Sequence, residues 1–289
     1  MSSLFRTDIQ GLRAIAVLMV IIFHYDENLL PSGFIGVDVF FVISGYLITL
    51  MLIALKSSEL GVKDKAVNFY ISRFKRIVPA YMFLLVVVAL IAATILIESD
   101  FKVFSRSLRS SFWFASNSYF ASYGGYFDPS VIEQPLLHTW SLAIEMQFYF
   151  IYPLFFLFIP IKFLRHLVLT VLILLVVYCQ QVTDDSNSSV YYDLFARLPA
   201  FLIGALPALY AIKLDGKYKD FSYVAGFIFM IAAIYLIDKE VVYPGFYSLL
   251  PSVAAMLVIV SSGARLSKWL GEPLLVWLGA LSYSLYLWH

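Results

Sequence analysis

Apolar residues run through this chain in stretches near 20 residues, with short polar segments between them. An apolar stretch of this length can cross a bilayer as an α-helix. The stretches predict helices at about 11–27, 34–55, 78–97, 138–160, 163–181, 193–213, 221–238, 244–262 and 273–289. We therefore predict an all-α, polytopic membrane bundle of nine to ten transmembrane helices.

A further segment, 103–122, has a different pattern. It carries Arg106, Arg109, Asn117 and several serines among its aromatic residues. Charged and polar groups are costly in the hydrocarbon core. The segment is therefore predicted to be a re-entrant or interfacial helix rather than a full span.

Basic residues concentrate in alternate connections, which sets the predicted orientation. The basic connections hold Lys56, Lys63, Lys65, Arg73, Lys75 and Arg76, then Lys162 and Arg165, then Lys213, Lys217 and Lys219, then Arg265 and Lys268. The intervening connections hold Asp26 and Glu27, Glu98 and Asp100, Asp128 and Glu133, and Asp184 and Asp185. Because cytoplasmic loops carry the excess of Lys and Arg, we predict a cytoplasmic N-terminus.

Composition agrees with a membrane protein and excludes other classes. The 289 residues are 62% hydrophobic and 13% charged, whereas a soluble domain is roughly half apolar and a quarter charged. The net charge of +1 argues against a nucleic-acid partner. A lone cysteine, Cys179, excludes an internal disulfide framework. With no repeat or soluble linker visible, residues 1–289 are predicted to form one membrane domain.

Two ionisable residues, Arg13 and His24, lie in the first apolar stretch. Eleven residues of α-helix turn through about 1100°, so both side chains share one face roughly 16 Å apart. Ionisable groups inside a membrane helix indicate function by default. From spacing alone, His24 fits a buried general base and an interfacial side chain equally well.

The predicted topology gathers many polar groups in the outer half of the membrane. These are His24, Asp38, His138, Glu145, Arg197, Tyr286 and His289. Their convergence predicts one buried polar site. Asp38 should have a partner such as His24 or Arg197, with a structural ion pair as the rival interpretation. Tyr286 fits an interfacial aromatic belt equally well.

Known catalytic motifs are sparse in this chain. No HExxH pattern occurs, so we predict no catalytic metal, and no GxSxG elbow surrounds Ser141. Arg73 and Arg76 lie one helical turn apart, a spacing that suits phosphate because guanidinium groups bind it bidentately. Contact with lipid headgroups is the rival interpretation for these two arginines.

Five segments together resemble the membrane acyltransferase family 3. They are TDIQGLRAIAV at 7–17 running to His24, GFIGVDVFFVISGYLIT at 33–49, FYISRFKRIVPAY at 69–81, HTWSLAIEMQFYFIYP at 138–153 and LGALSYSLYLWH at 278–289. They occur in the family's order from end to end. The most similar members are those that O-acetylate bacterial envelope glycans, namely O-antigen, peptidoglycan and exopolysaccharide.

The resemblance implies transfer of an acetyl group across the bacterial inner (cytoplasmic) membrane. Acetyl-CoA would be the cytoplasmic co-substrate, with no permanently bound cofactor, and an envelope glycan or lipid-linked saccharide the acceptor. The family's Arg-x10-His pattern falls on Arg13 and His24, and its Arg-x-x-Arg pattern falls on Arg73 and Arg76 as contacts for the CoA phosphates. His24, Asp38, His138 and Glu145 are the expected catalytic residues, and Asp38 or Glu145 would hold the His24 imidazole. Arg197, Tyr286 and His289 are expected to bind substrate.

Two departures from the family pattern stand out. Met146 follows Glu145 where relatives usually have a second Glu, so no role of that second carboxylate carries over. Relatives also commonly continue past the YLWH stretch, often into an extracytoplasmic esterase-like domain. We expect this chain to be a C-terminally truncated part of such a protein, whose acetyl-accepting domain or partner lies downstream.

A proton-coupled transporter of a small or phosphorylated solute is the main rival function. Intramembrane His, Asp, Glu and Arg also serve such carriers, many of which are built from repeated halves with broken helices. No internal repeat is visible in this chain. Acyl transfer is therefore the preferred prediction.

Overall fold

The computed structural model describes residues 6–127, 133–184, 188–238 and 241–289. Its α-helices are α1 (Thr7–Tyr25), α2 (Gly36–Lys56), α3 (Val62–Ile95), α4 (Glu98–Phe112), α5 (Ser116–Ala121), α7 (Thr139–Phe158), α8 (Ile161–Asp184), α9 (Leu194–Leu209), α10 (Lys217–Leu236), α11 (Leu249–Val260) and α12 (Pro273–Trp288). Its 3₁₀ helices are η1 (Gly33–Ile35), η2 (Ser188–Tyr192), η3 (Phe246–Ser248) and η4 (Arg265–Gly271). No strand occurs in these ranges, and the predicted all-α class is confirmed. Asp128 and Asp185 of the predicted acidic connections lie outside the described residues.

Each of the nine predicted apolar stretches contains a helix, but the count of nine to ten spans is not confirmed. Among the described residues, six helices are long and apolar enough to cross a membrane: α1, α2 with η1, α3, α7, α8 and α10. A seventh span results if the segment 246–260 and η4, bent by 102°, are counted as one. Helices α9 and α12 are apolar but shorter, at 16 residues each.

The third predicted helix begins much earlier than expected. Helix α3 starts at Val62 instead of 78, so Arg73 and Arg76 lie inside a 34-residue helix and not in the loop before it. At 1.5 Å per residue the helix is about 51 Å long, well beyond a hydrocarbon core of about 30 Å. Its first part can therefore be basic while the rest is apolar. Pro79 lies within the helix.

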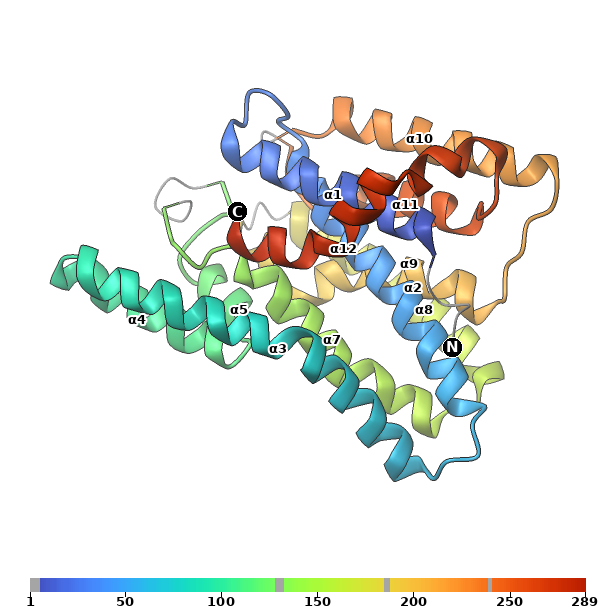
Figure 1. Ribbon diagram of the computed structural model, residues 1–289, viewed down its shortest axis with the longest axis horizontal. Helices are drawn as coiled ribbons and strands as arrows, with labels where there is room; N and C mark the ends of the chain where they lie inside the picture. Colours follow the sequence, from blue (N-terminus) through green and yellow to red (C-terminus); the bar gives the residue numbers. More distant parts are fainter. Residues whose placement is uncertain (1–5, 128–132, 185–187, 239–240) are drawn as a thin grey trace.

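The ambiguous segment 103–122 is divided between two helices. They are α4 and α5, and the turn between them contains Phe114 at φ 52°. Neither is among the helices long and apolar enough to span. Helix α4 lies beside α3, and together the two extend away from the rest of the bundle (Figure 1).

Glycines allow the two closest helix crossings. Helices α2 and α9 meet at Gly45 and Gly204, where an added Cβ would lie 2.0 Å from the Phe201 oxygen and 2.0 Å from the Val42 oxygen, respectively. Helices α1 and α12 meet at Gly279, whose Cβ would lie 1.9 Å from the Gln10 oxygen. These crossings position the site, because α2 and α9 carry Asp38 and Arg197, and α1 carries Arg13 and His24.

Substituting Gly45 with alanine is expected to destabilise the protein by about 1–3 kcal/mol, the usual cost of overpacking, because α2 and α9 would have to separate. Gly61→Ala is the matched control, since the nearest atom to its Cβ is a side-chain oxygen of Asp64 at 3.6 Å. Thermal unfolding of the purified protein in detergent measures the difference. Equal midpoints for the two variants would show that the α2–α9 contact is not tight.

Basic residues cap helix C-termini at one end of the bundle. The Lys56 ammonium donates to the carbonyl oxygens of Phe156 at 2.6 Å and Ile159 at 2.5 Å, at the end of α7. Arg165 Nε donates to the Leu209 oxygen at the end of α9, at 2.7 Å. Cations stabilise helix C-termini because unpaired carbonyl groups collect there. We call this the basic end.

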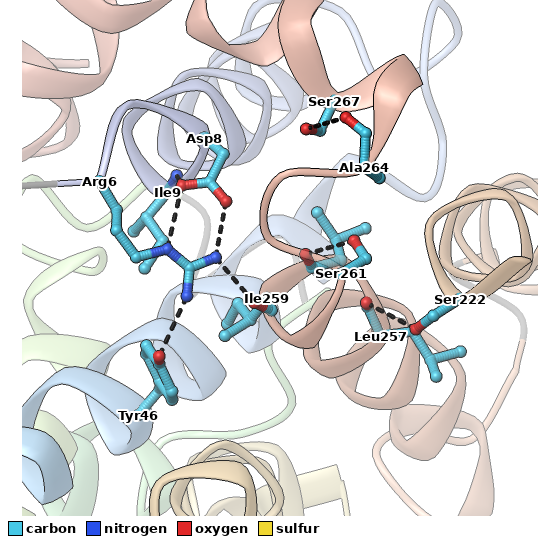
Figure 2. Close-up of polar contacts among 11 residues, drawn as sticks. Arg6, Asp8, Ile9, Tyr46, Ser222, Leu257, Ile259, Ser261, Ala264 and Ser267 are labelled. Atoms are coloured by element: carbon cyan, nitrogen blue, oxygen red, sulfur yellow. Dashed lines mark hydrogen bonds and ion pairs between the residues drawn. The ribbon is translucent and has the colours of Figure 1, made fainter. Parts of the chain in front are cut away.

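Arg6 ties three helices together near the start of α1. Its guanidinium forms an ion pair with Asp8 at 2.6 Å and donates to the Tyr46 hydroxyl at 3.0 Å and to the Ile259 oxygen at 2.7 Å (Figure 2). Ile259 lies in α11 and Tyr46 in α2. The first turn of α1 is thereby fixed against both helices, with α1 running from here to His24.

Candidate functional site

Three arginines line one internal cavity, which we call the arginine cavity. Arg13 comes from α1, and Arg73 and Arg76 come from α3, as the resemblance implied for a cofactor site. Glu145 is the only carboxylate in the lining. The cavity holds about 70 Å³ and is otherwise lined mainly by apolar residues of α2 and by hydroxyl-bearing residues of α7 and α12. An excess of guanidinium groups in such a site favours an anionic ligand.

Glu145 lies with the arginines and not with the histidines, which corrects the prediction of a single outer site. One of its oxygens accepts hydrogen bonds from the Ser44 hydroxyl at 2.5 Å and from the Tyr149 hydroxyl. Both donors also line the arginine cavity. Glu145 is therefore held in place by the wall of this cavity, and it does not hold the His24 imidazole.

One face of α12 lies along α1 and contacts both Arg13 and His24. Arg13 Nε donates to the Ser282 hydroxyl at 3.1 Å, and the His24 and His289 rings are 4.7 Å apart between centroids. Arg13 and His24 thus share the face of α1 that lies against α12, as their spacing predicted.

His24 opens into a second cavity, of about 610 Å³, which we call the histidine pocket. It is lined by Phe23, His24, Tyr25, Asp26, Glu27, Tyr126, Phe127, Glu133, Gln134, Pro135, Leu137, His138 and His289. Among the described residues, the lining contains three carboxylates and no Lys or Arg. Its charge is therefore opposite to that of the arginine cavity.

The contacts of His24 define which ring nitrogen is available for chemistry. Nδ1 lies 2.8 Å from the Val20 carbonyl oxygen, which can only accept, so in the neutral ring Nδ1 carries the proton. Nε2 then presents its lone pair, and it lies 3.0 Å from the Tyr126 hydroxyl. The expectation that Asp38 or Glu145 holds this imidazole is wrong. The helix's own backbone does so, because Val20 lies one turn before His24.

Tyr126 was not identified from the sequence. It lies in the connection after α5, and no motif there distinguishes it from the neighbouring aromatic residues. Burial raises the pKa of its hydroxyl well above the usual value, so the group stays protonated and donates to Nε2. Its ring stacks on Tyr191 with centroids 4.2 Å apart, and only the tertiary structure brings these loops together.

His138 and His289 complete the group of rings beside His24. Their centroids are 5.5 Å apart. His289 Nδ1 donates to the Tyr286 carbonyl oxygen at 2.6 Å, and His138 Nε2 is buried without a hydrogen-bond partner in the described part of the chain. Within that part, no group of three His, Cys, Asp or Glu residues is placed to hold a metal ion.

Asp38 and Arg197 pair with each other in the protein core. Arg197 Nη1 lies 3.2 Å from Asp38 Oδ1, and both residues are 1% exposed. Tyr243 donates to Asp38 Oδ2 at 2.7 Å, and the Arg197 guanidinium lies 4.2 Å from the Tyr191 ring centroid. Neither charged residue lines the arginine cavity or the histidine pocket. The structural ion pair, the rival interpretation for Asp38, is the observed arrangement, and the single polar site of the sequence prediction is in fact three sites.

The core pair still connects to His24 through aromatic rings. Arg197 packs against Tyr191, Tyr191 stacks on Tyr126, and the Tyr126 hydroxyl contacts His24 Nε2. Cation–π contact and ring stacking both favour fixed ring positions. The ion pair therefore supports the platform that holds Tyr126 against His24.

Comparison with known proteins assigns the chain to a family. The family described as an acyltransferase domain, acyltransferase family 3, matches residues 6–289. BcsY of Komagataeibacter xylinus, which bears the name of a membrane-bound transacylase, is 34% identical over 98% of this chain and 72% of its own length. The O-acetyltransferase OatA of Staphylococcus aureus is 35% identical over 97% of this chain, which spans 49% of OatA. No solved structure matches.

The chain therefore belongs to acyltransferase family 3, a family of enzymes. Its apolar helices agree with a membrane protein. The five segments that carry the resemblance supply the lining residues of the arginine cavity, but of the histidine pocket they supply only Phe23, His24, His138 and His289. Arg13, Arg73, Arg76 and Glu145 lie in one cavity, and His24, His138 and His289 lie in the other.

Proposed function

We propose that this protein transfers an acetyl group from cytoplasmic acetyl-CoA to a hydroxyl group of an extracytoplasmic envelope glycan. The observation that carries the proposal is the pair of neighbouring cavities with opposite charge. One suits a polyphosphate donor and the other suits a neutral or cationic polyol. The family membership and the name of OatA support acyl transfer to oxygen.

The donor enters by the arginine cavity. Arg73 and Arg76 line the cavity from α3 and bind the CoA phosphates, while Arg13 lines it from α1 beside Ser282. A bidentate guanidinium contact fits phosphate geometry. The cavity is too small for the nucleotide part of CoA, so the thioester end occupies it.

The acceptor enters by the histidine pocket. Asp26, Glu133 and Gln134 give this pocket carboxylate and amide groups, which hydrogen-bond to sugar hydroxyls. A lipid-linked saccharide or a glycan strand offers such hydroxyls. The same carboxylates repel a phosphorylated donor. The two substrates are thereby directed to different openings.

His24 acts as the general base in this scheme. Its Nε2 accepts the proton of the acceptor hydroxyl once that hydroxyl has displaced the Tyr126 hydroxyl from Nε2, as the acceptor oxygen attacks the thioester carbonyl carbon. The carbon–oxygen ester bond forms, the carbon–sulfur bond breaks, and the proton passes from His24 to the CoA thiolate. The Val20 carbonyl holds Nδ1–H throughout and so keeps Nε2 as the base.

The orientation follows from the charge of the loops. We place the protein in the bacterial cytoplasmic membrane with the basic end and the N-terminus in the cytoplasm. Acetyl-CoA then reaches the arginine cavity from its own compartment.

Replacing Arg73 and Arg76 together with glutamine is expected to raise the KM for acetyl-CoA roughly 30-fold or more, because each lost charge-assisted bond costs about 1.5–3 kcal/mol. The full chain in proteoliposomes, supplied with radiolabelled acetyl-CoA and an envelope glycan fraction, gives both KM and product. Lys75→Gln is the matched control, since Lys75 lies between these arginines in sequence but does not line the arginine cavity.

Two results would contradict the proposed function. Equal KM values for the double variant and Lys75→Gln would show that acetyl-CoA does not bind at the arginine cavity. Uptake of a radiolabelled sugar without any covalent acetylation would favour the transporter.

A further inference from the structure

A thin wall separates the arginine cavity from the histidine pocket. The two linings share no residue. Ser141 and Tyr286 line the arginine cavity, while His138 and His289, which contact Tyr286, line the histidine pocket. The Tyr286 and His289 ring centroids are 5.0 Å apart. The Tyr286 side chain therefore lies between the two spaces.

Hydrogen bonds hold this wall closed. The hydroxyls of Ser141 and Tyr286 are 2.6 Å apart, and both lie within reach of the His138 carbonyl oxygen, at 3.3 and 3.2 Å. Ser141 is 5% exposed and Tyr286 is 7% exposed. These contacts join α12 to the start of α7, at the point where the acyl group must pass to reach His24.

We propose that Tyr286, locked by Ser141, closes the outer end of the arginine cavity and limits the acyl group that passes to the acceptor beside His24. A rotation of the Tyr286 side chain about its χ1 bond opens the wall, and the hydrogen bonds to Ser141 and His138 restore it. The barrier keeps water and acceptor from the thioester until the acyl group moves. The statement about acyl groups rests on the proposed function, whereas the barrier itself does not.

Acyl length is limited by the same wall. The side chains of Val37, Phe40 and Leu142 narrow the cavity beside Tyr286, and its volume of about 70 Å³ leaves space for a few water-sized groups. An acetyl group fits between these side chains and the Tyr286 ring. A longer chain meets the ring, so truncating Tyr286 enlarges the set of acyl donors.

The barrier is tested by thiol accessibility, which needs no acyl transfer. In a Cys179→Ser background, Val37→Cys places a thiol in the arginine cavity, since Val37 lines it and is 5% exposed. A charged, membrane-impermeant methanethiosulfonate is added to either face of sealed vesicles. The labelling rate is expected to rise at least tenfold in Tyr286→Ala when the reagent is added to the membrane face of the histidine pocket, which we call the histidine face. The rate with reagent added at the face of the basic end, the basic face, is expected to stay unchanged.

Matched variants separate the barrier from general loosening of the bundle. Tyr152→Phe is the control because the Tyr152 and Thr49 hydroxyls form a similar buried pair, 3.0 Å apart, that lines neither cavity. Ser141→Ala and Tyr286→Phe remove the hydrogen bond and keep the ring. For both variants we expect a labelling rate between that of the unsubstituted protein and that of Tyr286→Ala. Fast labelling from the histidine face with Tyr286 intact, or no increase in any of the three variants, would overturn the proposal.

Acyl selectivity provides the second measurement. The rate with propionyl-CoA relative to acetyl-CoA is expected to rise about tenfold in Tyr286→Ala and to stay constant in Tyr152→Phe. If the propionyl-CoA to acetyl-CoA rate ratio is unchanged in Tyr286→Ala while acetyl transfer is measurable, Tyr286 does not limit the length of the acyl group. Absence of transfer from either donor in the unsubstituted protein would instead contradict the proposed function, and the labelling experiment would still decide the barrier.

Discussion

His24→Gln and His24→Ala are each expected to lose at least about 1,000-fold in kcat for acetyl transfer, with the KM for acetyl-CoA nearly unchanged. General-base catalysis is worth roughly 100- to 10,000-fold, and Nε2 of His24 is the proposed base. The proposed donor site is formed by arginines in a separate cavity, so the affinity for acetyl-CoA should not depend on the imidazole. A fall in kcat at constant KM is the pattern for an interaction made only in the transition state.

The control for His24 is His166→Gln. His166 is an exposed residue of α8 and lines neither cavity. Acetyl transfer in proteoliposomes measures all three variants. Full activity in His24→Ala would refute the mechanism, and an acetylated His24 trapped by rapid quenching and mass analysis would show a nucleophile in place of a base.

Arg197→Met is expected to destabilise the protein by about 3–5 kcal/mol, since it leaves the Asp38 carboxylate buried without its cation. Asp38→Asn removes the other charge and is expected to have an effect of similar size. The double variant Asp38→Leu/Arg197→Met should recover most of the loss, because apolar residues replace a buried pair at little cost. Thermal unfolding in detergent measures the series.

An exposed ion pair gives the comparison. Lys102 and Glu98 lie 2.7 Å apart on α4 with side chains 68% and 84% exposed, so Lys102→Met should change the unfolding midpoint very little. If Arg197→Met has an equally small effect, the core pair does not stabilise the fold. Activity of the double variant within tenfold of the parent would show that Asp38 stays out of the chemistry, whereas a well-folded but inactive double variant would restore Asp38 to a catalytic role.

Local patterns in the sequence were sufficient to predict several parts of the site. Arg13 and His24 share a helix face, as do Ser282, Tyr286 and His289, because helical periodicity alone determines which side chains of one helix align. The apolar stretches likewise predict where helices form. The start of α3 was misplaced because its first turns are basic and lack an apolar run.

Contacts between distant segments could not be predicted in this way. Glu145 has the same spacing from His138 whether it faces arginines or histidines, and the packing of α7 against α2 places it beside Ser44. Tyr126 belongs to a connection without any distinguishing motif, yet its hydroxyl meets His24. Such pairings depend on how the helices cross.

The sequence by itself determined that this is an all-helical membrane acyltransferase with ionisable groups inside its apolar helices, because hydrophobic length, charge and motif order are properties of the chain. Only the tertiary structure decided that these groups form an arginine cavity, a histidine pocket and a core ion pair. The physical reason is the close approach of helices at Gly45 and Gly204 and at Gly279. Those crossings set which side chains meet across the bundle, and no spacing along one helix contains that information.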